Sequence, residues 1–183
     1  MKKLWMFMPA ALLVACGGET ETKVTEPVQD TVEEVTEEVI PELNYVADSS
    51  AEETIQKYLK QKKWDGVRHE SGMYVVIDSA GTEEKPNLSH EVTIFYHGYL
   101  LDGTEFDGTG TEPATFALTD LIPGWQIGIP MFGKGGKGKL IIPPGLAYGP
   151  NDNGQIPGNS TLMFEIELVD WQKAAPKQPQ IFW

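Results

Sequence analysis

The side chains that most often do chemistry in proteins are few and scattered in this chain. Its three histidines, His69, His90 and His97, show no metal-ligand spacing with one another, with cysteine or with carboxylates, so no metal site is expected. The segment Gly133-Lys-Gly-Gly-Lys-Gly138 looks like a phosphate-binding loop but lacks the Gly-Lys-Ser/Thr ending. The function is therefore expected to need no metal, nucleophile or cofactor.

The only cysteine, Cys16, ends an N-terminal targeting signal. Two lysines precede an apolar run from Leu4 to Val14, which is too short to span a bilayer. The run ends in Leu13-Val14-Ala15-Cys16, which resembles a bacterial lipobox. Residues 1–15 are then a lipoprotein signal peptide, and the protein is lipid-anchored through Cys16, facing the periplasm or the cell surface. The alternative is an ordinary secretory peptide with an incidental cysteine.

The net charge of −13 is unevenly distributed along the chain. Residues 17–50 hold ten acidic side chains against Lys23 alone, with almost no aromatic residues. Such a segment cannot bury enough apolar surface to offset the entropy lost on ordering. Residues 16–50 are therefore interpreted as a disordered acidic tether. The acidic balance of the whole chain also argues against nucleic acid as a partner.

Ordered structure is expected to begin with a short helix over residues 51–66. Ile55, Tyr58 and Leu59 share one helical face, acidic residues lead and lysines trail, and Asp65-Gly66 ends the pattern. This helix is expected to pack on its own domain, and a dimerisation arm is the alternative.

From Gly72 onward the apolar period changes to two, which is typical of strands. The strand-like runs cover residues 73–78, 91–97, 115–118, 137–142 and 161–170. Leu101-Asp102-Gly103-Thr104 predicts a hairpin, because Asp-Gly tolerates the positive φ of a tight turn. Pro123 suits the first position of a short helix. Many strands around one short helix predict an α+β domain with an antiparallel sheet.

Four motifs make this reading more specific. They run from Val92 to Asp107, from Phe116 to Trp125, from Leu140 to Gly149, and from Ile156 to Leu168. Between residues 72 and 172, in their order and spacing, they resemble the FKBP family of peptidyl-prolyl cis/trans isomerases. Four ordered motifs are a far more specific signal than a lone Gly-Trp pair.

The resemblance implies a fold and a set of site residues. The fold would be an antiparallel half-barrel sheet of five or six strands wrapped around one short α-helix, over residues 67–172, with residues 173–183 as a tail. A pocket would lie between the sheet and the helix. Its catalytic residues would be Phe106, Asp107, Trp125 and Tyr148. Its substrate-binding residues would be Tyr96, Leu121, Ile122, Ile156 and Phe164, with the backbone N–H of Ile122 holding a substrate carbonyl.

The chemistry of the implied reaction explains these residue types. Rotation about an X-Pro bond faces a barrier of roughly 18–20 kcal/mol, because resonance keeps the amide planar. Water stabilises the planar, charge-separated form, so an apolar aromatic box favours the twisted form by excluding water and gripping the proline ring. Asp107 and Tyr148 would then act as fixed polar groups that orient carbonyls.

Each site residue also has a plainer interpretation. Phe106, Trp125 and Phe164 could be ordinary core aromatics, and Asp107 could be a turn residue bonded to its own backbone. The main alternative to an isomerase is an FKBP-like chaperone or binding module that grips Pro-containing segments without turnover. A surface lipoprotein whose acidic tether engages partners is a third.

The sequence departs from the family pattern at three places, of which only the first two bear on activity. Ala114 stands where many relatives carry an aromatic residue at the pocket rim. Gly158 replaces the second proline of a usual Ile-Pro-Pro and is expected to loosen its loop. The loop from Pro150 to Gln155 is too short for an inserted chaperone flap. The expected partners are unfolded or folding extracytoplasmic proteins with X-Pro bonds. Macrolides of the tacrolimus/rapamycin type are a second ligand class, and the protein is expected to be a monomer.

Overall fold

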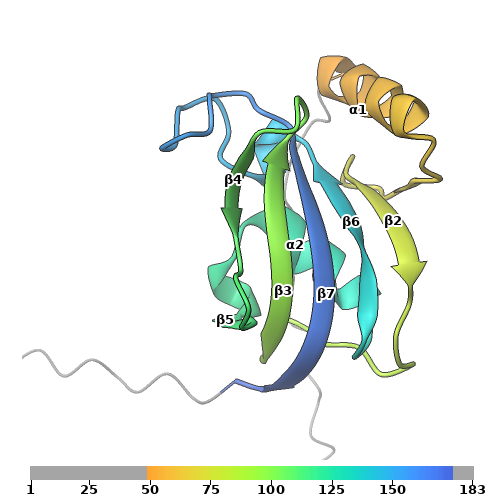
Figure 1. Cartoon of the computed structure of the whole chain (residues 1–183), viewed down its shortest axis with the longest axis vertical. Coiled ribbons are helices and arrows are strands. Elements are labelled where there is room, and N and C mark those ends of the chain that lie inside the picture. Colours follow the sequence, from red (N-terminus) through yellow and green to blue (C-terminus); the bar gives the residue numbers. More distant parts are fainter. Residues whose placement is uncertain (1–48, 175–183) are drawn as a thin grey trace, which may run out of the picture. The chain divides into compact units, whose positions relative to one another are not determined.

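The computed structural model describes residues 49–174, which form one antiparallel sheet with a short helix packed on each face (Figure 1). The strands are β1 (Val67–Arg68), β2 (Tyr74–Ser79), β3 (His90–Leu100), β4 (Glu105–Gly108), β5 (Ala114–Ala117), β6 (Gly136–Ile142) and β7 (Leu162–Lys173). The helices are α1 (Ser49–Lys62) and α2 (Pro123–Gly128), with single 3-10 turns at η1 (Leu118–Asp120), η2 (Ile129–Met131) and η3 (Pro144–Leu146). The signal peptide, Cys16 and most of the predicted tether and tail lie outside the described residues.

The sheet runs in the order β1-β2-β6-β7-β3-β4, and β5 also pairs with β3. Every pairing is antiparallel. The two longest strands, β3 and β7, pair along their whole length, from His90 with Lys173 to Leu100 with Leu162. The predicted antiparallel α+β fold is confirmed. The sheet has seven strands rather than five or six, because β1 and β4 are too short for a period of two to be recognised.

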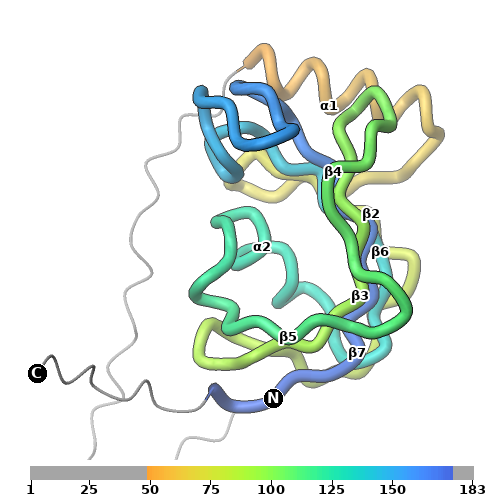
Figure 2. Tube along the Cα trace, turned by 60° about the vertical axis from the view of Figure 1, so that its left-hand side comes forward, coloured from red at the N-terminus to blue at the C-terminus, as the bar shows by residue number. Residues whose placement is uncertain are grey.

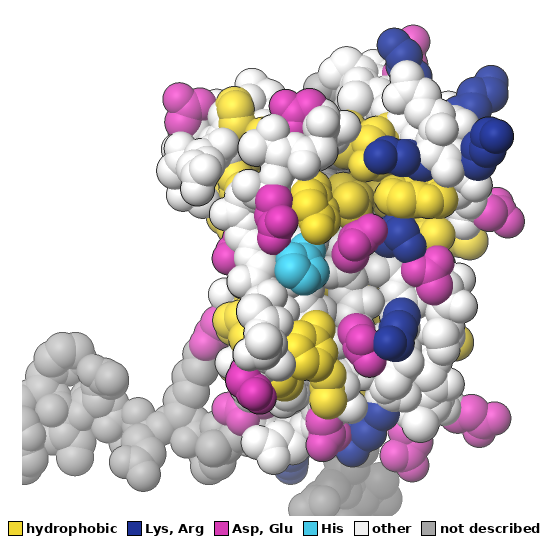
Figure 3. Space-filling model, in the orientation of Figure 1, with side chains coloured by type: hydrophobic (Ala, Val, Ile, Leu, Met, Phe, Trp, Pro, Cys, Tyr) yellow, Lys and Arg dark blue, Asp and Glu magenta, His cyan; other side chains and the backbone are white. Residues whose placement is uncertain are grey.

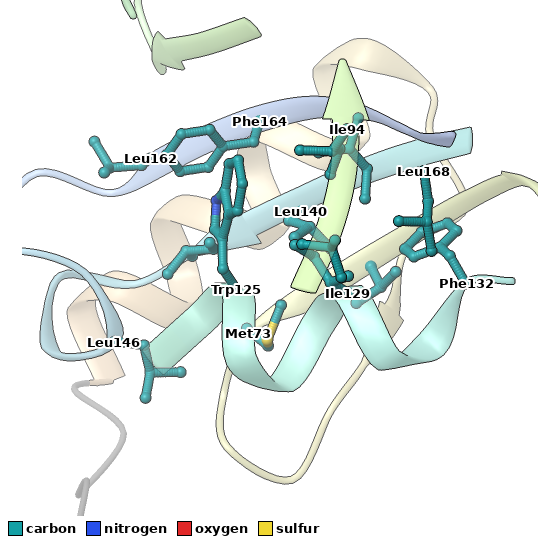
Figure 4. Packing of buried hydrophobic residues seen from close by; sticks show 14 of the residues in the cluster. Met73, Ile94, Trp125, Ile129, Phe132, Leu140, Leu146, Leu162, Phe164 and Leu168 are labelled. Carbon is teal, nitrogen blue, oxygen red and sulfur yellow. The ribbon is translucent and has the colours of Figure 1, made fainter. Parts of the chain in front are cut away.

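The main core lies between the inner face of the sheet and α2 (Figure 4). Side chains on a strand alternate between faces, and in β7 Leu162, Phe164, Ile166 and Leu168 all point into this core, as the alternation predicts. Trp125 and Ile129 enter it from the helical side. Figure 2 shows α2 on one side of the sheet, below the loop that leads into β7.

Helix α2 is held by its packing, because six residues are too few for a stable isolated helix. Pro123 occupies its first turn, as the sequence predicts. Glycines face the sheet: a Cβ on Gly124 would lie 2.4 Å from Ile142, and one on Gly128 would lie 2.7 Å from Leu140. The absence of these side chains lets the helix approach the sheet closely.

Helix α1 covers part of the outer face. Ile55, Tyr58 and Leu59 form the apolar side that the sequence predicts. They pack with outward-facing residues of the sheet to form a second core, contributed by Tyr74, Val76, Ile141 and Met163. The helix thus packs on its own domain, as expected.

The helix ends at Lys62, before the predicted stop at Asp65-Gly66. Lys63 adopts a left-handed conformation with φ of 58°, and the N–H of Trp64 donates to the carbonyl of Leu59 at 3.0 Å. This is the hydrogen-bond pattern of a Schellman motif. Glycine is the usual residue at that position, so a lysine there gives no sequence signal.

Glu52 ties α1 to the first two strands. Arg68 donates from Nε and Nη2 to the two oxygens of this carboxylate at 2.7 and 2.9 Å, and the hydroxyl of Tyr74 donates at 2.9 Å. These donors, Arg68 first, lower the pKa of Glu52 from 4.5 to about 2. Because the pKa is depressed in the folded state, the tie stabilises the fold above pH 4.5 and is lost as the pH falls toward 2.

Among residues 49–174, no helix is long and apolar enough to cross a membrane.

Replacing Ile55 tests whether α1 is an integral part of the fold. Ile55 is fully buried, so Ile55→Ala is expected to lower the free energy of unfolding by roughly 2–5 kcal/mol through lost burial and a cavity. Urea unfolding followed by far-UV circular dichroism measures this change. Lys57→Ala, at an exposed position of the same helix, is the matched control and should change little. Equal, small losses in both variants would mean that α1 is dispensable.

Candidate active site

The inner face of the sheet carries a connected group of aromatic rings at the N-terminal end of α2. Trp125 stands edge-on to Tyr96 and to Phe164, with ring centroids 5.1 Å apart in each pair. Phe106 packs edge-on to Phe164 at 5.6 Å, and Phe116 lies 6.3 Å from Trp125. Edge-to-face packing at these distances is favourable for aromatic pairs. In Figure 4 the Trp125 ring rises from α2 toward Phe164 on β7. We refer to these five rings as the aromatic cluster.

The aromatic cluster depends on a glycine in the middle of β3. A Cβ on Gly98 would lie 2.7 Å from Cζ of Phe106 and 2.9 Å from Cε1 of Phe164, closer than real side-chain contacts allow. A glycine inside a strand often marks such a close approach. Gly98 therefore provides the space in which these two rings meet.

The exposure of the predicted site residues increases from the aromatic cluster to Tyr148 beside it. Trp125 and Phe164 are 4% and 3% exposed, whereas Tyr148 is 41% exposed. Phe106 is half-buried. The indole N–H of Trp125 is buried and has no hydrogen-bond acceptor within residues 49–174. This arrangement gives an apolar floor with polar groups at its margin.

Asp107 is the charged group at this margin. Its Oδ2 accepts a hydrogen bond from the Tyr96 hydroxyl at 2.9 Å, and its Oδ1 accepts from the N–H of Gly108 at 2.8 Å. The N–H of Thr109 donates to the carbonyl of Tyr96 at 2.9 Å, which ties the chain after Asp107 to β3. The carboxylate is thus held by donors on both oxygens.

The two tyrosines near Asp107 are kept protonated. Burial, followed by the hydrogen bond to Asp107 and its charge, raises the pKa of Tyr96 to about 12. Burial, followed by the charge of Asp107, also raises the pKa of Tyr148 above its ordinary value. Both hydroxyls therefore remain hydrogen-bond donors at neutral pH.

The remaining predicted substrate-binding residues join the same core. Leu121, Ile122 and Ile156 pack with Trp125 and Phe164. Ile122 caps α2, and its carbonyl accepts from the N–H of Trp125. Its own N–H donates to no acceptor within residues 49–174. The structure thus brings Tyr96, Phe106, Leu121, Ile122, Trp125, Ile156 and Phe164 into one cluster, with Asp107 and Tyr148 beside it.

The departures at positions 114 and 158 have different consequences. Ala114 is half-buried and pairs with Ile94, so it adds no ring to the aromatic cluster. The N–H of Gly158 donates to Oδ1 of Asp152 at 2.8 Å, and a Cβ here would lie 2.0 Å from the Pro150 carbonyl oxygen. A proline has neither the N–H nor the space. The contacts of Gly158 therefore hold its loop, contrary to the loosening expected from the sequence.

A separate hollow of about 380 Å³ lies near the start of α1. It is lined by Ser50, Ala51, Thr54, Leu100, Leu101, Asp102, Pro144, Pro157, Asn159, Ser160 and Thr161. None of the predicted site residues lines it, and Oδ1 of Asp102 accepts from the N–H of Thr104 at 2.8 Å. The aromatic cluster is the better candidate, because it combines an apolar floor with a fixed carboxylate.

In the described part of the chain, no three His, Cys, Asp or Glu residues are grouped to hold a metal ion.

Two residues that shape the site were not among the predicted site residues. Phe116 contacts both Tyr96 and Trp125, but its four-residue strand is too short for its inward side to be recognised. Gly98 could have been noticed as a glycine amid strand-forming residues, which signals a close backbone or side-chain approach.

Comparisons of the sequence with known proteins identify one family. The model of the family described as FKBP-type peptidyl-prolyl cis-trans isomerase matches residues 82–169. FkpA of Escherichia coli K12 is 44% identical over 133 residues, covering 71% of this chain and 48% of FkpA. The outer membrane protein MIP of Legionella longbeachae is 43% identical over 108 residues, covering 57% of this chain and 46% of MIP. The chain thus spans about half the length of these curated relatives.

Solved structures give the same result. The crystal structure of Escherichia coli FkpA matches with a TM-score of 0.64 at 40% identity, covering 70% of this chain and 61% of that one. A peptidyl-prolyl cis-trans isomerase from Pseudomonas syringae pv. tomato matches with a TM-score of 0.59 at 30% identity, covering 68% of this chain and 95% of that one. The antiparallel sheet with its short helix has the α+β fold of this solved isomerase. This chain belongs to the family of FKBP-type peptidyl-prolyl cis-trans isomerases.

A methyl group added at Gly98 is expected to disrupt the aromatic cluster. In Gly98→Ala the rings of Phe106 and Phe164 have to move, and overpacking of this kind costs about 1–3 kcal/mol. Thermal unfolding should show a lower Tm, and the near-UV circular dichroism of the aromatic rings should change. Gly110→Ala is the matched control, because a Cβ there meets nothing within 4 Å. An unchanged near-UV spectrum in Gly98→Ala would contradict the packing described here.

Proposed function

We propose that this chain accelerates cis/trans isomerisation of X-Pro bonds, with the proline ring bound on the aromatic cluster. The observation that carries the proposal is the placement of a fixed carboxylate, Asp107, at the margin of an apolar floor made by Trp125 and Phe164. Membership of the family supports the same reaction. The chain matches only about half the length of FkpA and of MIP. The isomerase activity of the whole protein is therefore proposed here.

Desolvation supplies the first part of the mechanism. A planar amide is charge-separated and is stabilised by water, whereas the twisted amide has lost that resonance. Binding against Trp125, Phe106 and Phe164 removes water from the X-Pro bond. The loss of water raises the free energy of the planar amide relative to that of the twisted amide and so lowers the barrier to rotation. The N–H of Ile122 supports a hydrogen bond to a substrate carbonyl, because no other group uses it within residues 49–174.

Fixed polar groups supply the second part. A twisted amide has a carbonyl carbon that is more positive than in the planar form, and a carboxylate held nearby stabilises it. Asp107 already accepts hydrogen bonds from Tyr96 and Gly108, so it acts as a fixed charge and not as a proton acceptor. The protonated hydroxyl of Tyr148 donates to a carbonyl of the substrate.

Two variants separate these contributions in a peptide isomerisation assay. Asp107→Val keeps the apolar shape and removes the charge that stabilises the twisted amide. We expect kcat/KM to fall by about ten- to a hundredfold, which corresponds to a loss of about 1.4–2.7 kcal/mol of transition-state stabilisation. Phe106→Ala opens the floor to water and should weaken both peptide binding and turnover.

Matched controls keep the assay specific. Asp65→Val removes an exposed carboxylate between α1 and β1, and Phe95→Ala removes a ring from the outward side of β3. Both variants should retain the wild-type rate. If the wild type does not exceed the spontaneous rate, the chain is instead a binding module or chaperone for Pro-containing segments. An active wild type with unimpaired Asp107→Val and Phe106→Ala variants would place the site elsewhere.

We also propose that the protein works outside the cytoplasm on unfolded or folding clients, held to a membrane through acylated Cys16. The support is the lipobox-like Leu13-Val14-Ala15-Cys16 sequence after an apolar run. A relative carries the name outer membrane protein. Two or more acyl chains anchor firmly where one does not. Cys16 lies outside the described residues, so the sequence alone supports this anchor.

Cys16→Ser tests the anchor. The variant is expected to move from the membrane fraction to the soluble extracytoplasmic fraction, because the thiol that receives the lipid is absent. Its isomerase activity per molecule should match the wild type, since the isomerase domain is unchanged. Immunoblotting of cell fractions provides the readout. A variant that stays with the membrane would refute the lipobox interpretation.

A further inference from the structure

The charges of the domain are separated between the site and the rest of its surface. The stretches 101–133 and 140–172 contain every predicted site residue except Tyr96, and they hold no lysine or arginine. In the described part of the chain, all of these basic side chains lie elsewhere, at Lys57, Lys60, Lys62, Lys63, Arg68, Lys85, Lys134, Lys137, Lys139 and Lys173. Figure 3 shows dark-blue side chains over α1 and the β2–β6 side, whereas the charged side chains along the β4 edge are magenta.

Several basic side chains are already neutralised away from the site. Arg68 pairs with Glu52, Lys134 with Asp170, Lys137 with Glu167, and Lys139 with Asp78. The carboxylates of these four pairs are Glu52, Asp170, Glu167 and Asp78, and none of them is a predicted site residue.

Four carboxylates lie on the segments that frame the cluster. Asp107 is in the site itself, and Asp120 directly precedes Leu121. Glu112 is in the β4–β5 connection, which Thr109 ties to the backbone of Tyr96. We call Asp107, Glu112, Asp120 and Asp152 the acidic rim.

Asp152 is fixed in position by its loop. Its Oδ1 accepts from the N–H of Gly158, and the same loop carries Ile156 into the core beside Trp125. Asn153 and Ile156 close the turn between them through a pair of backbone hydrogen bonds. Asp107, Glu112 and Asp152 take part in none of the ion pairs formed within residues 49–174. Their negative charge is therefore directed to whatever occupies the site.

We propose that the acidic rim sets the substrate preference of the site, so that it favours prolines flanked by lysine or arginine and disfavours prolines flanked by acidic residues. The inference rests on the proposed isomerase function and names the substrate class of the same site. Charge of one sign around a binding surface raises the encounter rate of oppositely charged ligands and repels like-charged ones. The apolar floor takes the proline ring, and the rim acts on the side chains beside it.

A matched peptide series tests the preference. Three short peptides share a Leu-Pro core and carry Lys, Ala or Glu on both sides of it, and isomerisation is followed by NMR exchange so that no coupling protease is needed. At low ionic strength we expect kcat/KM for the Lys peptide to exceed that for the Glu peptide by about tenfold or more, within the range for electrostatic steering. At about 1 M salt the Debye length falls to roughly 3 Å, and the ratio should approach one.

Two double variants locate the effect. Glu112→Gln with Asp152→Asn removes two rim charges, and the asparagine keeps an oxygen for the N–H of Gly158. Glu53→Gln with Glu165→Gln removes the same charge from exposed positions on α1 and on the outer side of β7. The Lys-to-Glu peptide ratio should fall several-fold in the rim variant and stay near wild type in the control.

The outcomes separate this inference from the function on which it rests. Wild-type activity on the Ala peptide with equal rates for Lys and Glu peptides would overturn the rim proposal and leave the isomerase standing. Equal loss of preference in both double variants would also overturn it, because net charge would then be the cause. No acceleration of any peptide would refute the isomerase, and the rim proposal with it.

Discussion

The close approach of α2 to the sheet is the constraint on which the site depends. Gly124 and Gly128 remove the side chains that would hold the helix away from Ile142 and Leu140, and Trp125 can then pack edge-on against Tyr96 and Phe164. Moving the helix outward by one methyl group would open this contact to water. The same packing that stabilises the fold therefore creates the apolar surface that the proposed reaction needs.

The sheet serves two purposes on its two faces. Its inner face carries the aromatic cluster and, through β4, Asp107. Its outer face binds α1, which is fastened by Ile55 in the second core and by Glu52 on Arg68. Because β2, β6 and β7 contribute to both cores, α1 packs on the outer side of the strands that support the site. A rigid support suits a mechanism that relies on fixed groups and dry surface, and not on proton transfer.

Much of this architecture could be predicted from the sequence, for identifiable reasons. The inward alternation of β7 and the first turn of α2 follow from periodicity and from Pro123, and both are present. The site residues came from resemblance, since periodicity cannot tell a binding ring from a core ring. The left-handed turn at Lys63 could not be predicted, because glycine is the usual residue there. The packing of Gly158 could not be predicted either, because its contacts with Pro150 and Asp152 form only in the folded loop. The placement of Phe116 against Trp125 is of the same kind.

The most direct test of the account is an exchange NMR experiment on a Leu-Pro peptide with a small amount of the protein, in which the Trp125 and Tyr58 resonances are assigned. The account predicts cis–trans exchange cross peaks at mixing times at which the free peptide shows none. It also predicts contacts from the proline ring protons to the Trp125 ring, with Tyr58, which belongs to α1 on the outer face, unaffected. Catalysed exchange without any contact at Trp125, or contacts only at Tyr58, would contradict it.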